Sequence, residues 1–149
     1  MGKVLIYLDN CCYNRPYDDQ SQARINLETQ AKLYIQKLIV EKRVSLAYSY
    51  MSRYENSQNP FKIRKDTISD FFKNASVYID ENNAEVIQQK ASDIVKTGIK
   101  AKDATHIACA IIGKVDIFLS TDIRLLKYQT NEIKLMNPTA FLSEMEEIL

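Results

Sequence analysis

Residues 100–122 decide the fold and read KAKDATHIACAIIGKVDIFLSTD. From position 102 to 112 apolar residues recur at helical spacing, and Gly113 ends that pattern. The segment 115–119 follows and is apolar except for Asp116, a pattern typical of a strand buried on both faces of a sheet. The acid Asp122 comes three residues after that segment. A helix leading into such a strand predicts an α/β domain with a parallel sheet.

The same alternation of apolar runs and helical patterns extends along the whole chain. Residues 11–22 (CCYNRPYDDQSQ) are expected to form a polar loop, and Asn83 is expected to cap a helix. One domain over residues 1–149 is predicted, with a central parallel sheet and helices on both faces. Its strands are expected at 3–8, 44–49, 77–79, 115–119 and 133–136, and its helices at 22–42, 50–58, 60–74, 84–95, 102–112, 122–128 and 138–149.

Composition excludes several classes of protein. The 149 residues are 46% hydrophobic and carry 20 Lys and Arg against 19 Asp and Glu, so neither a disordered chain nor a bulk polyanion binder is expected. Three cysteines and a single histidine predict neither a disulfide framework nor a zinc site. No apolar stretch suits a signal peptide or a membrane span, so we expect a cytoplasmic protein.

Four carboxylates are predicted to lie at one edge of the sheet. In a parallel α/β sheet, ligands bind beyond the carboxyl ends of the strands. The acids that follow strands or begin helices there are Asp9, Glu55, Asp103 and Asp122. Like charges brought together disfavour ionisation, and a divalent cation relieves the repulsion. Because all four donors are oxygens, the set suits Mg²⁺ or Mn²⁺.

Each of these acids also has a structural interpretation. Asp122 is well placed to cap a helix, and Asp103 is an acid of the kind favoured in a first helical turn. Asp9 could turn the chain after its strand, and Glu55 could be a solvated helix residue. The functional interpretation therefore depends on the joint placement of the four side chains.

Basic residues flank the acids and suit a phosphate backbone. Lys100 and Lys102 immediately precede Asp103, and a second basic run occupies residues 61–65. His106 lies one turn beyond Asp103, where it could be a buried, satisfied histidine, contact phosphate or orient Asp103. A carboxylate site of this kind, flanked by cations, favours hydrolysis of a nucleic-acid backbone.

With these residues in these positions, the chain resembles the PIN domain, a nuclease family that includes the VapC toxins of toxin–antitoxin pairs. The resemblance covers nearly the whole chain, and its last three blocks are the most specific ones. The matching blocks, in chain order, are VLIYLDN, AYSYMSRYE, KAKDATHIACAI, DIFLSTD and IKLMNPTAFL.

The resemblance implies an Mg²⁺- or Mn²⁺-dependent ribonuclease that acts on single-stranded RNA and leaves a 5′-phosphate and a 3′-hydroxyl. It further implies a homodimer and an antitoxin partner. The metal would be held by Asp9, Glu55, Asp103 and Asp122. Asn10, Ser120 and Thr121 would hydrogen-bond the carboxylates or the waters on the metal. The residues expected to contact the substrate are Lys100, Lys102, His106 and Arg15.

Two features depart from the family pattern. Arg124 stands where many members have a further acid, which predicts weak binding of a second metal. The long segment after Asp9 contains Arg15, Asp18 and Asp19, which are expected to shape a surface for a substrate or partner.

Two rival functions stay open. The domain could keep the fold and a weak acidic site but act only as an RNA- or protein-binding module. A phospho-acceptor signalling domain is the other rival, but it needs an acidic pair after its first strand, where this chain has Asp9 and Asn10.

Overall fold

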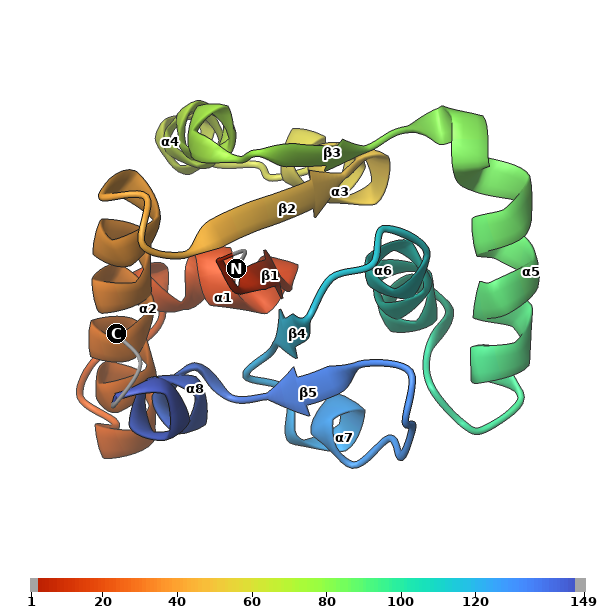
Figure 1. Cartoon of the computed structure of the whole chain (residues 1–149). Coiled ribbons are helices and arrows are strands. Elements are labelled where there is room, and N and C mark those ends of the chain that lie inside the picture. Colours follow the sequence, from red (N-terminus) through yellow and green to blue (C-terminus); the bar gives the residue numbers. More distant parts are fainter. Residues whose placement is uncertain (1–2, 147–149) are drawn as a thin grey trace.

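The computed structural model describes residues 3–146, which form one α/β domain built on a five-stranded parallel sheet. The strand order is β3-β2-β1-β4-β5, so the first strand of the chain lies in the centre (Figure 1). β1 pairs in parallel with β2 on one side and with β4 on the other. The strands are β1 (Leu5–Leu8), β2 (Ser45–Ser49), β3 (Val77–Ile79), β4 (Ile117–Leu119) and β5 (Lys134–Met136).

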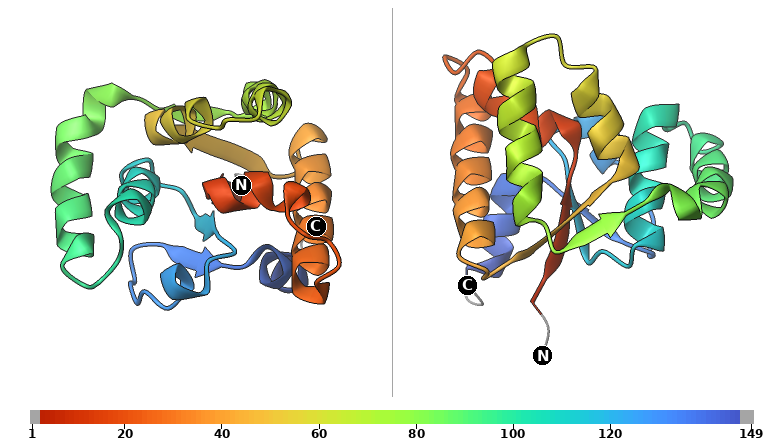
Figure 2. Two further views of the ribbon diagram at one scale, coloured as in Figure 1. Left: turned by 180° about the vertical axis from the view of Figure 1, so that it is seen from behind. Right: turned by 90° about the horizontal axis from the view of Figure 1, so that it is seen from above.

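Helices cover both faces of this sheet, which confirms the predicted architecture. Figures 1 and 2 show α2 and α8 on one side and α5 and α6 on the other, with α5 outermost. The helices are α1 (Asn10–Asn14), α2 (Ala23–Val40), α3 (Tyr50–Ser57), α4 (Lys62–Phe71), α5 (Ala84–Val95), α6 (Ala101–Ile112), α7 (Ile123–Leu126) and α8 (Pro138–Met145).

The side chains of β1 alternate between two core layers. Ile6 and Leu8 pack toward α2 and α8, whereas Tyr7 packs toward α5 and α6. All three are at most 1% exposed. This is the burial on both faces that the apolar runs predicted, because helices on each side remove the strand from water.

The prediction of a polar loop at residues 11–22 is wrong over its first half. Asp9 caps α1, and a 3₁₀ turn, η1 (Arg15–Tyr17), follows. Polarity alone suggested a loop, but Arg15 pairs with Glu28 and Asn14 with Asn59, both distant along the chain. Asn83 stands before α5 without a side-chain capping bond, and Asp80 caps the preceding turn instead. The predicted end of the last helix, at position 149, lies outside the described residues.

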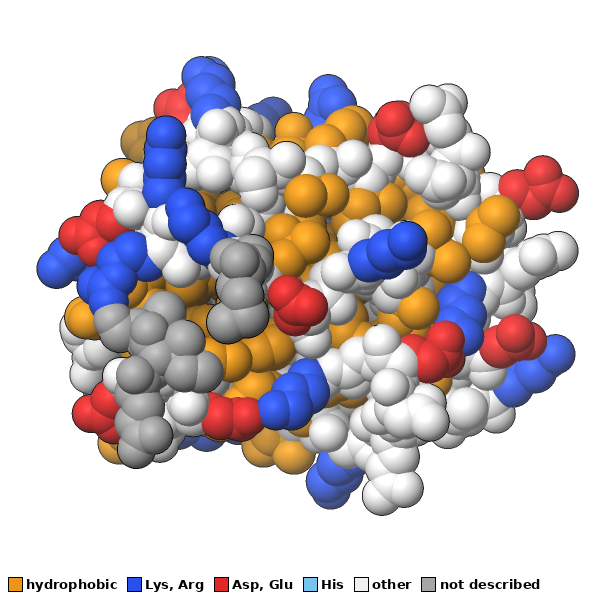
Figure 3. Space-filling model, in the orientation of Figure 1, with side chains coloured by type: hydrophobic (Ala, Val, Ile, Leu, Met, Phe, Trp, Pro, Cys, Tyr) orange, Lys and Arg blue, Asp and Glu red, His pale blue; other side chains and the backbone are white. Residues whose placement is uncertain are grey.

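Three strand ends lead directly into the elements that carry Asp9, Glu55 and Asp122, and Asp103 lies in the first turn of α6, which follows α5. β1 leads into α1, β2 into α3 and β4 into the turn before α7. Figure 3 shows the opposite face, at the amino ends of the strands, where acidic and basic side chains are interspersed. Within the described part of the chain, no helix is both long and apolar enough to cross a membrane.

Candidate active site

Asp9 ends β1 and is held by hydrogen bonds to both carboxylate oxygens. Its side chain is buried, with 5% of the residue exposed. The backbone N–H of Asn10 donates to Oδ1 at 2.9 Å, and the Ser120 hydroxyl donates to Oδ2 at 3.0 Å. The Cys11 thiol also donates to Oδ2, at 3.3 Å. Three donors on one buried carboxylate hold it in a fixed orientation at the carboxyl end of the central strand.

The turn after β4 connects Asp9 with Asp122. The Ser120 hydroxyl, which donates to Asp9, accepts a hydrogen bond from the backbone N–H of Asp122 at 3.0 Å. Asp122 caps α7, because its Oδ1 accepts from the Arg124 N–H at 2.9 Å. The structural interpretation of Asp122 is therefore correct, and the capping bonds leave Oδ2 available at the site.

Asp103 lies in the first turn of α6 and shares a small cavity with Asp122. This cavity, of about 110 Å³, is also lined by Lys100 and Arg124. Burial raises the pKa of Asp103 to about 6, and the negative charges of Asp9, Asp122 and Glu55 add to that effect. The four predicted acids thus share one electrostatic environment at the carboxyl edge of the sheet.

Glu55 lies on α3 and is paired with His106 of α6. The ring Nε2 of His106 contacts Oε1 of Glu55. Burial by itself would raise the pKa of Glu55, but the hydrogen bond to His106 and the charge of Lys102 outweigh it and lower the pKa below its usual value. Glu55 therefore stays ionised beside three other acids.

The oxygen donors of the four carboxylates suit a hard divalent cation, but the four side chains do not converge on one point. Among residues 3–146, no three side chains of the His, Cys, Asp or Glu type are close enough to form a ready-made metal group. Burial is the main cause of the raised pKa of Asp103 and the charges of Asp9, Asp122 and Glu55 add to it, so a cation held by these acids would relieve the repulsive part. Oxygen donors suit Mg²⁺ or Mn²⁺.

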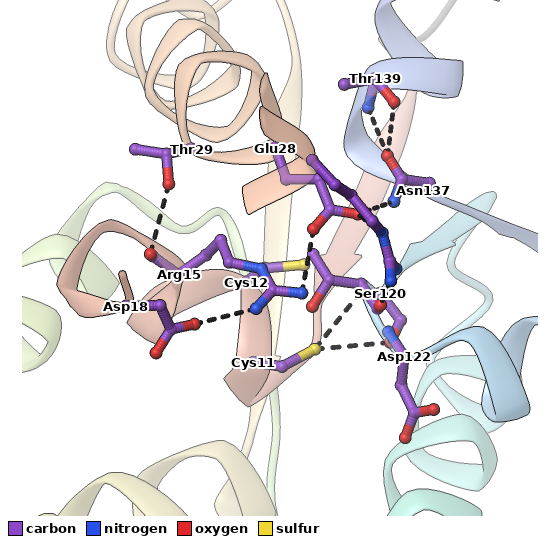
Figure 4. A network of polar contacts seen from close by, with 12 residues as sticks. Cys11, Cys12, Arg15, Asp18, Glu28, Thr29, Ser120, Asp122, Asn137 and Thr139 are labelled. Carbon is purple, nitrogen blue, oxygen red and sulfur yellow. Dashed lines mark hydrogen bonds and ion pairs between the residues drawn. The ribbon is translucent and has the colours of Figure 1, made fainter. Parts of the chain in front are cut away.

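Arg15 is part of an internal network, which corrects its predicted role in substrate contact. Its guanidinium lies 3.0 Å from Asp18 and 2.9 Å from Glu28. The Glu28 side chain is 2% exposed and also pairs with Arg24. Figure 4 shows the Arg15 guanidinium between the two carboxylates, with the Asp122 carboxylate pointing away from them. Arg15 therefore supports the site from within, whereas Asp18 and Asp19 of the same segment are exposed.

This network also holds the turn after β4 in place by a hydrogen bond to its backbone. Arg24 donates to the carbonyl oxygen of Thr121 at 2.7 Å, and the Asn137 amide donates to Glu28. Asn137 caps α8, so one buried carboxylate connects α2, α8 and the turn that carries Asp122. Thr121 takes part in this network through its backbone carbonyl. The side-chain oxygen of Asn10 accepts a hydrogen bond from the Asn14 amide at 3.3 Å.

His106 is not placed where it could contact a phosphate. It is 1% exposed, and its two ring nitrogens face Tyr7 and Glu55. Lys100 and Lys102, in contrast, are exposed beside the acids. Sequence reasoning missed Tyr7, although a tyrosine within a fully buried strand signals that its hydroxyl needs a partner.

Comparison with known proteins supports the fold. No family model and no curated protein matches the chain. A solved structure that matches is the FitAcB crystal structure from Neisseria gonorrhoeae, with a TM-score of 0.54 and 19% sequence identity. The match covers 90% of this chain and 98% of that one. This likeness confirms the expectation from the sequence: the chain folds as a PIN-like α/β domain.

Proposed function

We propose that this chain is a metal-dependent endoribonuclease that hydrolyses phosphodiester bonds of single-stranded RNA. The observation that carries the proposal is the cavity that Asp103 and Asp122 line together with Lys100 and Arg124. Burial raises the pKa of Asp103 there, and the negative charges of Asp9, Asp122 and Glu55 add to that effect. Perturbed carboxylates in a cleft are typical of catalytic sites.

In this proposal Asp9, Glu55, Asp103 and Asp122 hold Mg²⁺ or Mn²⁺. The cation, when bound, supplies Lewis-acid stabilisation of phosphate charge and a nucleophile at neutral pH. The chain supplies the rest: Ser120 and the Asn10 N–H orient Asp9, and Lys100 and Lys102 receive the phosphate backbone.

The direct test is cleavage of a fluorescent single-stranded RNA in Mg²⁺ or Mn²⁺ by the wild type and by Asp9→Asn. We expect cleavage by the wild type, none in EDTA, and a loss of at least ~100-fold in the variant. Asp93→Asn, on an exposed position of α5, is the matched control. Cleavage that persists in EDTA, or equal rates for wild type and Asp9→Asn, would overturn the proposal.

Phosphate contact by the two lysines predicts a change in salt dependence. The double variant Lys100→Ala/Lys102→Ala should bind single-stranded RNA more weakly at low salt. The slope of log K against log salt should become shallower by about 1.4, because each lost contact to a single strand contributes ~0.7. Binding is measured on the Asp9→Asn background so that the RNA stays intact. Lys37→Ala/Lys73→Ala, which removes two cations elsewhere, should leave the slope unchanged, and equal slopes for both doubles would contradict the prediction.

One observation favours the alternative of a binding module. The described residues hold no preformed group of three metal ligands, and Glu55 is already paired with His106. A domain that binds RNA or a protein without hydrolysis would show no rise in melting temperature with Mn²⁺, since only a ligand of the folded state stabilises it. A rise with Mn²⁺ favours the nuclease.

We further propose that the chain acts in the cytoplasm as a homodimeric toxin that is inhibited by an antitoxin protein. The support is the family resemblance carried by the site blocks together with the fold. Expression of the chain alone should slow growth, and co-expression of the product of the adjacent gene should restore it. Unchanged growth on expression would contradict the toxin role while leaving the nuclease proposal to its own test.

A further inference from the structure

The only histidine of the chain is enclosed between a tyrosine of the central strand and the candidate ligand Glu55. Tyr7 is 0% exposed and His106 is 1% exposed. The Tyr7 hydroxyl lies 2.5 Å from Nδ1 of His106, and Nε2 of the same ring contacts Glu55. The two rings meet edge to face at 5.6 Å, and Phe118 stacks on the other side of Tyr7 at 5.2 Å. Packing therefore fixes both rings.

The Tyr7 hydroxyl is also tied to the start of the helix that carries Glu55. Ser49 and Ser52 form the capping box of α3, each side chain accepting from the backbone N–H of the other. Their hydroxyls lie 2.7 and 3.0 Å from the Tyr7 oxygen. One phenol thus contacts both the helix start and the histidine that reaches the carboxylate of that helix.

The contacts of the Tyr7 hydroxyl determine where the protons of this chain of contacts lie. That hydroxyl is fully buried and has one proton to donate. The nearest acceptor for that proton is Nδ1 of His106. A neutral ring that accepts at Nδ1 carries its proton on Nε2 and donates it to Glu55.

We propose that Tyr7 and His106 are positioning residues that orient Glu55 through a directed chain of hydrogen bonds, from Tyr7 to Nδ1 and from Nε2–H to Oε1. The other carboxylate oxygen, Oε2, makes no hydrogen bond or ion pair with residues 3–146. The inference about Glu55 as a metal ligand rests on the proposed function, whereas the direction of the hydrogen bonds does not.

Nitrogen NMR tests the direction without metal. Because the chain has one histidine, ¹⁵N-histidine labelling of the full chain gives ring signals that need no assignment. We expect a protonated Nε2 and a bare Nδ1 in the wild type. Tyr7→Phe should move the Nδ1 signal and let some of the proton shift to Nδ1. A proton on Nδ1 in the wild type would overturn the proposal.

Tyr13→Phe is the matched control. Tyr13 is 2% exposed, lies in the opposite core layer, and its hydroxyl has no hydrogen-bond partner among the described residues. Its loss should leave the histidine spectrum unchanged. Equal spectral changes in Tyr7→Phe and Tyr13→Phe would show a general effect of core substitution and would contradict a specific contact.

Calorimetric Mn²⁺ titration then tests the link to Glu55. We expect Tyr7→Phe to weaken Mn²⁺ binding about 10-fold in the wild-type background and not at all in Glu55→Ala. His106→Gln, which keeps an amide donor toward Glu55, should retain more affinity than His106→Ala. Equal weakening by Tyr7→Phe in both backgrounds would show that Tyr7 acts on the fold alone. A wild type that binds no Mn²⁺ would contradict the proposed function, and the NMR result would still decide the direction of the chain.

Discussion

Asp103→Asn is expected to abolish most RNA cleavage while making the metal-free protein more stable. If Asp103 is a metal ligand as proposed, its loss should lower the rate at least ~100-fold, since even the partners of metal ligands matter by about 10- to 100-fold. In the metal-free protein the same carboxylate is repelled by Asp9, Asp122 and Glu55 and is half-buried. Asparagine keeps the shape and removes the charge.

The stability gain should depend on pH in a definite direction. The folded pKa of Asp103, about 6, lies above the value of 3.8 for an unperturbed carboxyl. Between these two values the folded wild type binds more protons than the unfolded chain, so its stability falls as the pH rises toward 6. Asp103→Asn should therefore match the wild type near pH 4 and exceed it above pH 6. After allowance for solvent screening, the gain is about 1 kcal/mol, or about 2–4 °C in melting temperature.

Thermal unfolding in EDTA at pH 4 and pH 7.5 measures this effect, with Asp93→Asn as the exposed control. Saturating Mn²⁺ should reverse the order at pH 7.5, because the cation stabilises only a folded state that holds it. An Asp103→Asn variant that is less stable than the wild type at pH 7.5 without metal would contradict the electrostatic account of the site.

Glu28→Ala should cause the largest loss of stability. Its buried carboxylate faces Arg15 and Arg24 and accepts from Asn137. Removal leaves the partly buried Arg15 guanidinium with Asp18 alone and frees the turn that Arg24 holds. Breaking a buried ion pair from one side costs about 3 kcal/mol or more, which is close to 10 °C in melting temperature here.

The control for this prediction is Glu144→Ala. Glu144 pairs with Lys134, and their side chains are 46% and 62% exposed, so its loss should cost less than about 1 kcal/mol. Glu28→Ala should also lower RNA cleavage, because the turn that carries Asp122 loses its anchor through Thr121. Equal melting temperatures for the two variants would refute the role assigned to this network.

The sequence predicted the fold well because its strands are buried runs with sharp ends. The run that became β4 is flanked by Gly113 and by the polar turn at Ser120, so both its position and its burial were readable. Parallel pairing followed from the helices between the strands. The prediction failed at α1 and η1, because Arg15 is satisfied by Glu28, thirteen positions away on another helix, and local polarity does not reveal such a partner.

The acids of the candidate site could be proposed from the sequence, but the residues that hold them in place could not. Strand ends identify Asp9 and Asp122, and a helix start identifies Asp103. Because His106 lies one turn beyond Asp103, the sequence indicated that both residues are on the same face of the helix. The partner of His106, Tyr7, could not be predicted because it is 99 positions away in the chain. Such long-range pairs depend on strand order, which periodicity does not specify.

The central place of β1 has a consequence for synthesis on the ribosome. β1 begins at Leu5, yet its second neighbour, β4, ends only at Leu119, and the bond from Ser120 to Asp9 joins residues 111 positions apart. Until that distant segment has emerged, β1 has one unpaired edge and Asp9 lacks Ser120. Non-local pairing of this kind forms slowly. A nascent chain that has not yet exposed Ser120 therefore lacks the bond that orients Asp9, and the candidate site cannot assemble before that segment emerges.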